Sequence, residues 1–111
     1  MAAIRPAALA EQIEQGQAPI ILDVRSSAEF EQGHVPGAIH LPFWQIRNRA
    51  AALPAATNAP IVVYCGHGPR AWLAGAALRR RGFARVIYLV GHMSGWRRAG
   101  LREERTPAGQ S

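Results

Sequence analysis

The chain of 111 residues has one cysteine, no lysine and no long apolar segment. A single cysteine excludes an internal disulfide, and the four scattered histidines add no zinc-binding spacing to it. We therefore expect neither a metal nor a cofactor. No apolar run approaches the roughly 20 residues of a membrane-spanning helix, and no secretion signal precedes the first charges. We expect a cytoplasmic protein that does not bind a membrane.

The positive charge of the chain, formally +6, comes entirely from arginine. Its forked guanidinium suits small oxyanions and phosphates, although a compositional bias towards arginine and alanine explains the excess equally well. The one compact basic run is Arg79-Arg80-Arg81, and no interleaved aromatic residues accompany it. Because cations favour the C-terminal end of a helix, we interpret this run as a solvated helix end. We predict no nucleic-acid partner.

Helices and short, apolar strands alternate along the sequence. Strands are predicted at 19–24, 38–41, 61–64 and 85–89, between helices at 6–15, 26–33, 43–53, 70–81 and 94–99. Nearly continuous apolar strands are typical of a parallel sheet covered on both faces. The pattern therefore predicts a three-layer α/β/α domain over residues 1–101, followed by a flexible polar tail at 102–111.

Cys65 ends the strongest predicted strand and begins a tight, glycine-rich loop. In parallel sheets, functional sites lie beyond the carboxyl ends of the strands. Gly66 and Gly68 allow the backbone to approach a bound group, and Pro69 fits the first turn of the next helix. A cysteine that merely fills space needs none of these residues. Loop amides and the helix N-terminus favour a thiolate, so Cys65 is the predicted nucleophile.

Four segments, spread over residues 20–97, resemble the rhodanese family in the same order. They are Asp23-Val24-Arg25 with Glu29-Phe30, the stretch Gly33-His34-Val35-Pro36-Gly37-Ala38-Ile39-His40-Leu41-Pro42, the loop Val63-Tyr64-Cys65-Gly66-His67-Gly68-Pro69-Arg70, and Leu89-Val90-Gly91 with Trp96. The second resembles the family's GHIPGA…P motif, and the third its C-x-x-G-x-R active loop. Together these two motifs are specific, and the resemblance implies a parallel sheet flanked by helices.

The resemblance also implies a reaction, in which the Cys65 thiolate takes a sulfur atom from a small anionic donor such as thiosulfate. Sulfite leaves, and a thiol or cyanide then removes the sulfur from the cysteine persulfide. The residues of the loop favour the same chemistry, because loop amides can stabilise the anionic sulfur without a metal or cofactor. The predicted substrate-binding residues are those of the loop: Gly66, His67, Gly68, Pro69 and Arg70.

Three roles depend on individual side chains near this loop. We predict that Arg70 binds the sulfonate end of a donor in preference to pairing with a carboxylate. The resemblance implies that Asp23 and Arg25 form a structural pair that supports loops near the site. Participation of His67 in the chemistry is left open. So is that of His92, which stands where the family's closing motif has its second glycine.

Other functions remain as alternatives. The chain could relay persulfide sulfur to a protein partner, or act as a phosphatase or arsenate reductase of the same fold. Four residues separate Cys65 from Arg70, whereas cysteine phosphatases use a longer spacing, which disfavours phosphate chemistry. The intact cysteine disfavours a non-catalytic interaction domain. The donor is open, because Gly66 stands where some thiosulfate-using relatives carry a basic residue.

The aromatic residues outside these motifs are interpreted structurally. Phe43, Trp44 and Trp72 are assigned to the core or a pocket wall rather than to a base-stacking platform.

Overall fold

The computed structural model describes residues 2–106 and contains a five-stranded parallel sheet. The strand order is β1-β5-β4-β2-β3. The strands are β1 (Ala3–Ile4), β2 (Ile20–Asp23), β3 (Ile39–His40), β4 (Pro60–Tyr64) and β5 (Arg85–Leu89). Because β4 occupies the middle of the sheet, Cys65 leaves the sheet at its centre.

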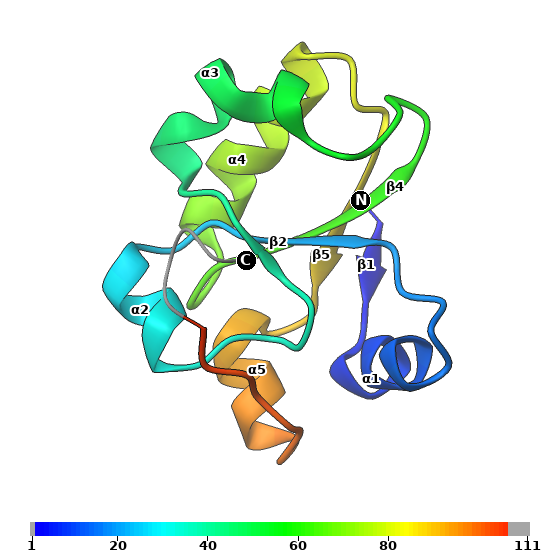
Figure 1. Ribbon diagram of the computed structural model, residues 1–111, viewed down its shortest axis with the longest axis vertical. Coiled ribbons are helices and arrows are strands. Elements are labelled where there is room, and N and C mark those ends of the chain that lie inside the picture. The colour runs from blue at the N-terminus through cyan, green and yellow to red at the C-terminus, as the bar shows by residue number, and fades with distance from the viewer. Residues whose placement is uncertain (1, 107–111) are drawn as a thin grey trace.

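Helices cover both faces of the sheet (Figure 1). They are α1 (Pro6–Glu14), α2 (Ser27–Gln32), α3 (Ile46–Arg49), α4 (Pro69–Arg80) and α5 (His92–Arg98), with 3-10 turns η1 (Phe43–Gln45) and η2 (Ala50–Ala52) flanking α3. Helices α3 and α4 pack on one face, whereas α1, α2 and α5 pack on the other. The predicted three-layer α/β/α class is therefore confirmed.

Alternating strand side chains divide the core into two clusters, because successive residues of a strand point to opposite faces. Val63 and Cys65 belong to the cluster under α4, together with Leu78. Val62 and Tyr64 belong to the cluster on the other face. This alternation sends the Cys65 side chain towards α4 and its neighbour Tyr64 towards the opposite layer.

Three elements differ from the sequence-based expectation. Strand β1 was not predicted, because two residues carry no periodicity; tertiary pairing with β5 creates it. The helix predicted at 43–53 is divided into η1, α3 and η2, and 3-10 turns are common at helix ends. Helix α5 begins at His92, directly after Gly91 in the left-handed region with φ 73°.

The ordered chain continues past residue 101, where we had placed the domain boundary. His34 and Glu104 exchange two backbone hydrogen bonds of 2.9 Å, and the Glu104 carboxylate accepts a 2.8 Å bond from the Gly37 amide. The indole N–H of Trp96 donates to the Arg102 carbonyl at 2.9 Å. The last part of the predicted tail, 107–111, lies outside the described residues.

Residues 2–106 contain no helix with the length and apolar character needed to cross a membrane. Phe43 packs partly buried against the α4-side core. Trp44 and Trp72, which we had interpreted as core or pocket wall, are instead 56% and 58% exposed.

Candidate active site

The loop from Cys65 to Pro69 joins the central strand to α4. Cys65 is fully buried, and the amide N–H of Gly68 donates a 2.9 Å hydrogen bond to its Sγ. Gly68 has a φ of 139°, a conformation that side chains rarely adopt. A Cβ at this position would also lie 3.5 Å from the His92 ring. Glycine thus lets the backbone turn its amide onto the sulfur.

Other amides of the loop are not consumed by the fold. Among residues 2–106, the N–H groups of Gly66, His67 and Arg70 donate to no backbone or side-chain acceptor. Pro69 contributes no N–H. The loop therefore combines one amide already on the sulfur with further donors that an added anion could use.

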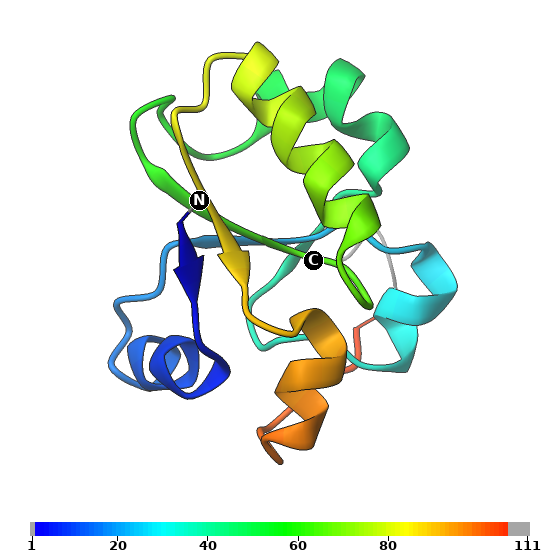
Figure 2. The ribbon, with the colours of Figure 1, turned by 180° about the vertical axis from the view of Figure 1, so that it is seen from behind.

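The Cys65 side chain is fully buried. Helix α5 lies beside the loop (Figure 2) and holds it by two backbone hydrogen bonds. The Met93 amide donates to the Cys65 carbonyl at 2.9 Å, and the Ser94 amide donates to the Gly66 carbonyl at 3.3 Å. The exposed His67 places its Nδ1 3.1 Å from the Ser94 hydroxyl. A donor can reach Sγ only after loop residues move.

Arg70 pairs with a carboxylate, which is the alternative that our sequence analysis disfavoured. Its guanidinium donates to both Glu29 oxygens, at 2.6 and 3.0 Å. Hydrogen bonds from Arg70 first and Ser26 second lower the pKa of Glu29 to about 2. A Cβ on Gly66 would be 3.1 Å from the Arg70 Nη2. The ion pair therefore lies against the active loop.

Asp23 and Arg25 form a buried network beneath the site. Arg25 donates to both Asp23 oxygens, with a closest distance of 2.7 Å, and also to the Gly33 carbonyl at 2.7 Å. The Tyr64 hydroxyl donates to Asp23 at 2.7 Å and accepts from the Val35 amide at 3.0 Å. Burial, and then the Asp23 charge, raise the pKa of Tyr64, so the phenol stays protonated. The network joins β2, β4 and the turn at 33–35.

His92 contacts the loop from the start of α5. The Cys65 amide donates to its Nδ1 at 3.3 Å, so a neutral ring carries its proton on Nε2. Burial, and then the charge of His67, lower the pKa of His92, which favours the neutral ring. With φ at 54°, His92 is the one described non-glycine residue in the left-handed region. The sequence showed that His92 replaces the second glycine of the family's closing motif, but it did not reveal the hydrogen bond with the Cys65 amide.

Glu29 and Tyr64 are site residues that sequence reasoning did not identify. Glu29 stands three residues after Ser26 and forms a capping box with it, in which the Glu29 carboxylate lies 3.2 Å from the Ser26 amide. The same carboxylate also reaches Arg70, 41 residues away. Local spacing carries no signal for that second contact, nor for the bond between Tyr64 and Asp23.

Within the described part of the chain, no three side chains of His, Cys, Asp or Glu come together as a metal site would require. The site combines a thiol that accepts one amide hydrogen bond, an imidazole bonded to the Cys65 amide and an ion pair beside the loop.

The sequence and the fold of this chain are similar to those of known proteins. Residues 5–99 match the family described as a rhodanese-like domain. A protein named sulfurtransferase from Allochromatium vinosum is 33% identical over 93 residues, which cover 84% of this chain and 85% of that protein. The thiosulfate sulfurtransferase GlpE of Pseudomonas savastanoi pv. phaseolicola is 33% identical over 81 residues, covering 73% of this chain and 74% of the relative.

Two further matches concern a longer relative and a solved structure. The putative sulfur carrier protein YrkF of Bacillus subtilis is 33% identical over 80% of this chain, which spans 47% of YrkF. The crystal structure of the Alr3790 protein from Anabaena sp. superposes with a TM-score of 0.85 at 29% identity, covering 93% of this chain and 82% of that one. The family match covers residues 5–99, and the fold superposes on a solved structure over 93% of the chain. The chain therefore belongs to the rhodanese family.

Proposed function

We propose that this protein is a sulfurtransferase that carries a sulfur atom as a persulfide on Cys65. The observation that carries the proposal is the 2.9 Å hydrogen bond from the Gly68 amide to Sγ, at the carboxyl end of the central strand. Family membership supports sulfur transfer in general, as do relatives named sulfurtransferase and sulfur carrier protein.

The proposed first half-reaction is a displacement at sulfur. The Cys65 thiolate attacks the outer sulfur of thiosulfate, a new S–S bond forms, and the old S–S bond breaks with its electron pair leaving on sulfite. The persulfide retains one negative charge, next to the amides of the loop. These amides can stabilise that charge without rearranging, because the fold already fixes their positions. The relatives named thiosulfate sulfurtransferase support thiosulfate as the donor.

The second half-reaction restores the thiolate. Cyanide or a thiolate attacks the terminal sulfur of the persulfide and leaves with it, as thiocyanate or as a new persulfide, while the bonding electron pair returns to Cys65. Because the chain has one cysteine, no second thiol of the same chain can resolve the persulfide. An external acceptor is therefore required in every cycle.

In this proposal Arg70 orients the anionic donor by exchanging partners. Its side chain is 31% exposed and the Glu29 side chain 37% exposed, so the pair is solvent-screened and is worth about 1 kcal/mol or less. A dianionic donor that displaces Glu29 would form an ion pair with the Arg70 guanidinium, and water would then solvate the Glu29 carboxylate. The exchange would also move the Arg70 guanidinium, which lies against Gly66.

The decisive test follows the sulfur atom. The protein is incubated with thiosulfate and its intact mass is measured. One added sulfur atom is expected on the wild type and none on Cys65→Ser. Addition of cyanide should remove the sulfur and release an equal amount of thiocyanate. A wild type that gains no sulfur, or a serine variant that still gains it, would overturn the proposal.

A persulfide relay to a protein partner is the second candidate. It is favoured by the similarity to a protein named as a sulfur carrier and by the burial of Cys65, which slows small donors and acceptors until the loop opens. A relay predicts that a docked protein acceptor removes the sulfur faster than small thiols at equal concentration. Equal rates would leave the simpler enzyme as the explanation.

A further inference from the structure

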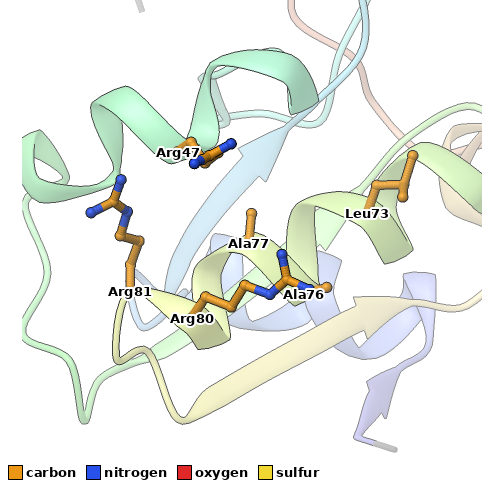
Figure 3. Close-up of a pocket in the computed structure, with 6 residues that line it drawn as sticks. All are labelled: Arg47, Leu73, Ala76, Ala77, Arg80 and Arg81. Atoms are coloured by element: carbon orange, nitrogen blue, oxygen red, sulfur yellow. The ribbon is translucent and has the colours of Figure 1, made fainter.

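The surface groove between α3 and α4 has no part in the chemistry described above. It has a volume of about 510 Å³ and is lined by Arg47, Leu73, Ala76, Ala77, Arg80 and Arg81. Figure 3 shows Arg47 on one side, Arg80 and Arg81 at the end of α4 on the other, and Ala77 between them. Basic side chains therefore surround a floor of small apolar residues.

The three guanidiniums of this arginine groove are not neutralised by the protein. Among residues 2–106, none of them forms an ion pair with a carboxylate, and no acidic residue lines the groove. Arg80 and Arg81 lie at the C-terminal end of α4, where the helix dipole offsets part of their charge. Most of the positive charge is left for an external anion.

Exposed apolar side chains on the first turns of α4 and on η1, which packs against α4, are here called the apolar strip. Among residues 2–106, four large apolar side chains are exposed: two are Trp72 and Leu73 on the first turns of α4, and a third is Trp44 on η1. Leu73 also lines the groove. Aromatic residues and arginines are the side chains enriched in protein interfaces. A small inorganic anion would use the arginines but would leave this strip exposed.

The distance between the groove and the thiol also favours a large partner. Helix α4 runs from Pro69, beside the active loop, to Arg80 at the groove. At about 1.5 Å per residue the two ends are about 16 Å apart. A small donor bound in the groove could not deliver sulfur to Cys65. A protein covering about 800 Å² of this surface would contact both ends at once.

We propose that the arginine groove and the apolar strip dock an acidic segment of a protein that exchanges sulfur with Cys65. This inference rests on the proposed function, because it identifies the partner of the same thiol. The three arginines line one groove, and this grouping suits a short cluster of carboxylates. The evenly spaced phosphates of a nucleic acid would be better matched by arginines arranged in a line along the surface.

Binding is tested first, without any sulfur chemistry. The probe is a fluorescein-labelled peptide with six glutamates, one leucine and a serine in place of cysteine, measured by anisotropy at low and moderate salt. The groove variant R47Q/R80Q/R81Q is compared with R5Q/R85Q/R98Q, which has the same net charge. We expect about ten-fold weaker binding by the groove variant, since each lost pair contributes about 0.5 kcal/mol. The control should change less than about two-fold.

Sulfur transfer is tested second, with the same variants. Wild type loaded with persulfide should pass sulfur to the cysteine-containing form of the peptide about ten-fold faster than to a form with glutamine in place of glutamate. The groove variant should lose this preference while its rate with cyanide stays unchanged. If Cys65 does not load with sulfur, the proposed function fails, and the binding result still decides the docking surface.

Three outcomes would overturn the docking proposal. The first is equal weakening in both triple variants, which would show non-specific charge attraction. The second is a labelled single-stranded oligonucleotide that binds more tightly than the peptide and loses binding in the groove variant. The third outcome concerns a groove variant that circular dichroism shows to be unfolded. R47Q and R80Q are then tested singly, and the proposal is overturned if neither weakens binding of the peptide.

Discussion

Two arginine–carboxylate pairs lie near Cys65, and their surroundings differ sharply. The Arg25–Asp23 pair is buried, with side-chain exposures of 3% and 0%, and its charges bond further to Tyr64 and a backbone carbonyl. The Arg70–Glu29 pair is about one third exposed and touches the loop itself. A buried pair cannot exchange partners without leaving an unpaired charge in the protein interior, whereas water can solvate the charges of an exposed pair. The buried pair therefore suits a structural role, whereas the exposed pair can exchange its partner.

The largest expected effect comes from breaking the buried pair. Asp23→Ala leaves the Arg25 guanidinium buried without its counter-charge and removes the acceptor of the Tyr64 hydroxyl. We expect the free energy of unfolding to fall by about 3–5 kcal/mol, measured by urea denaturation. Glu29→Ala is the matched variant and should cost about 1 kcal/mol from the ion pair, plus a similar amount from the lost cap. Equal losses would erase the distinction between the pairs.

The second effect is on catalysis and concerns Arg70. In Arg70→Ala we expect the KM for thiosulfate to rise about ten-fold, equivalent to one charge-assisted hydrogen bond of about 1.4 kcal/mol. The free energy of unfolding should fall by about 1 kcal/mol or less, the contribution of the exposed ion pair. The measurement is steady-state thiocyanate formation at fixed cyanide. An unchanged KM would mean that Arg70 only holds the loop to α2.

The third effect has the opposite sign. Glu29→Gln keeps a side chain that can cap α2 but removes the charge that competes for Arg70. We expect the KM for thiosulfate to fall about three-fold, because loss of a screened pair of about 0.7 kcal/mol releases the guanidinium. Thiol labelling of Cys65 should also become faster, as the loop loses a tether. A higher KM would show that Glu29 positions Arg70 for the donor instead of competing for it.

The fourth effect is a pH dependence of stability that belongs to the exposed pair. The pKa of Glu29 is lowered from 4.5 to about 2 in the folded protein. Its stabilising contribution is therefore complete above pH 4.5 and is lost as the pH falls towards 2. Urea denaturation should show that the wild type loses stability as the pH falls over this range. Glu29→Gln should lose less, by about 1 kcal/mol at most. Parallel curves for the two proteins would contradict it.

The smallest effect concerns His92, which faces His67 and the Cys65 amide. Its pKa is lowered in the folded state from 6.5, so the unfolded chain takes up a proton first and stability falls as the pH drops below 6.5. His92→Asn keeps an acceptor and tolerates the positive φ, and should abolish this step. Thermal unfolding between pH 8 and 5 measures it, and His67→Asn, which removes the smaller cause of the lowered pKa, should leave a reduced step. A step that persists in His92→Asn would assign it elsewhere.

Local patterns predicted much of the fold because they are written in neighbouring residues. Apolar runs indicated four of the five strands, and the helix predicted from residue 26 corresponds to α2, whose N-cap is Ser26. Strand β1 escaped because its two residues become a strand only by pairing with β5. The two exposed tryptophans were misplaced for a related reason. Composition favours their burial, but position on the outer face of α4 and η1 decides it.

The candidate site divides in the same way. The sequence by itself determined where a nucleophile would stand, since a cysteine, two glycines and a proline after an apolar strand dictate the loop and the helix that follows. Only the tertiary structure decided the partners of that loop. Glu29 meets Arg70 across 41 residues, His92 accepts the Cys65 amide across 27, and α3 brings Arg47 to the end of α4. Such contacts depend on how layers pack, and residue spacing along the chain does not encode them.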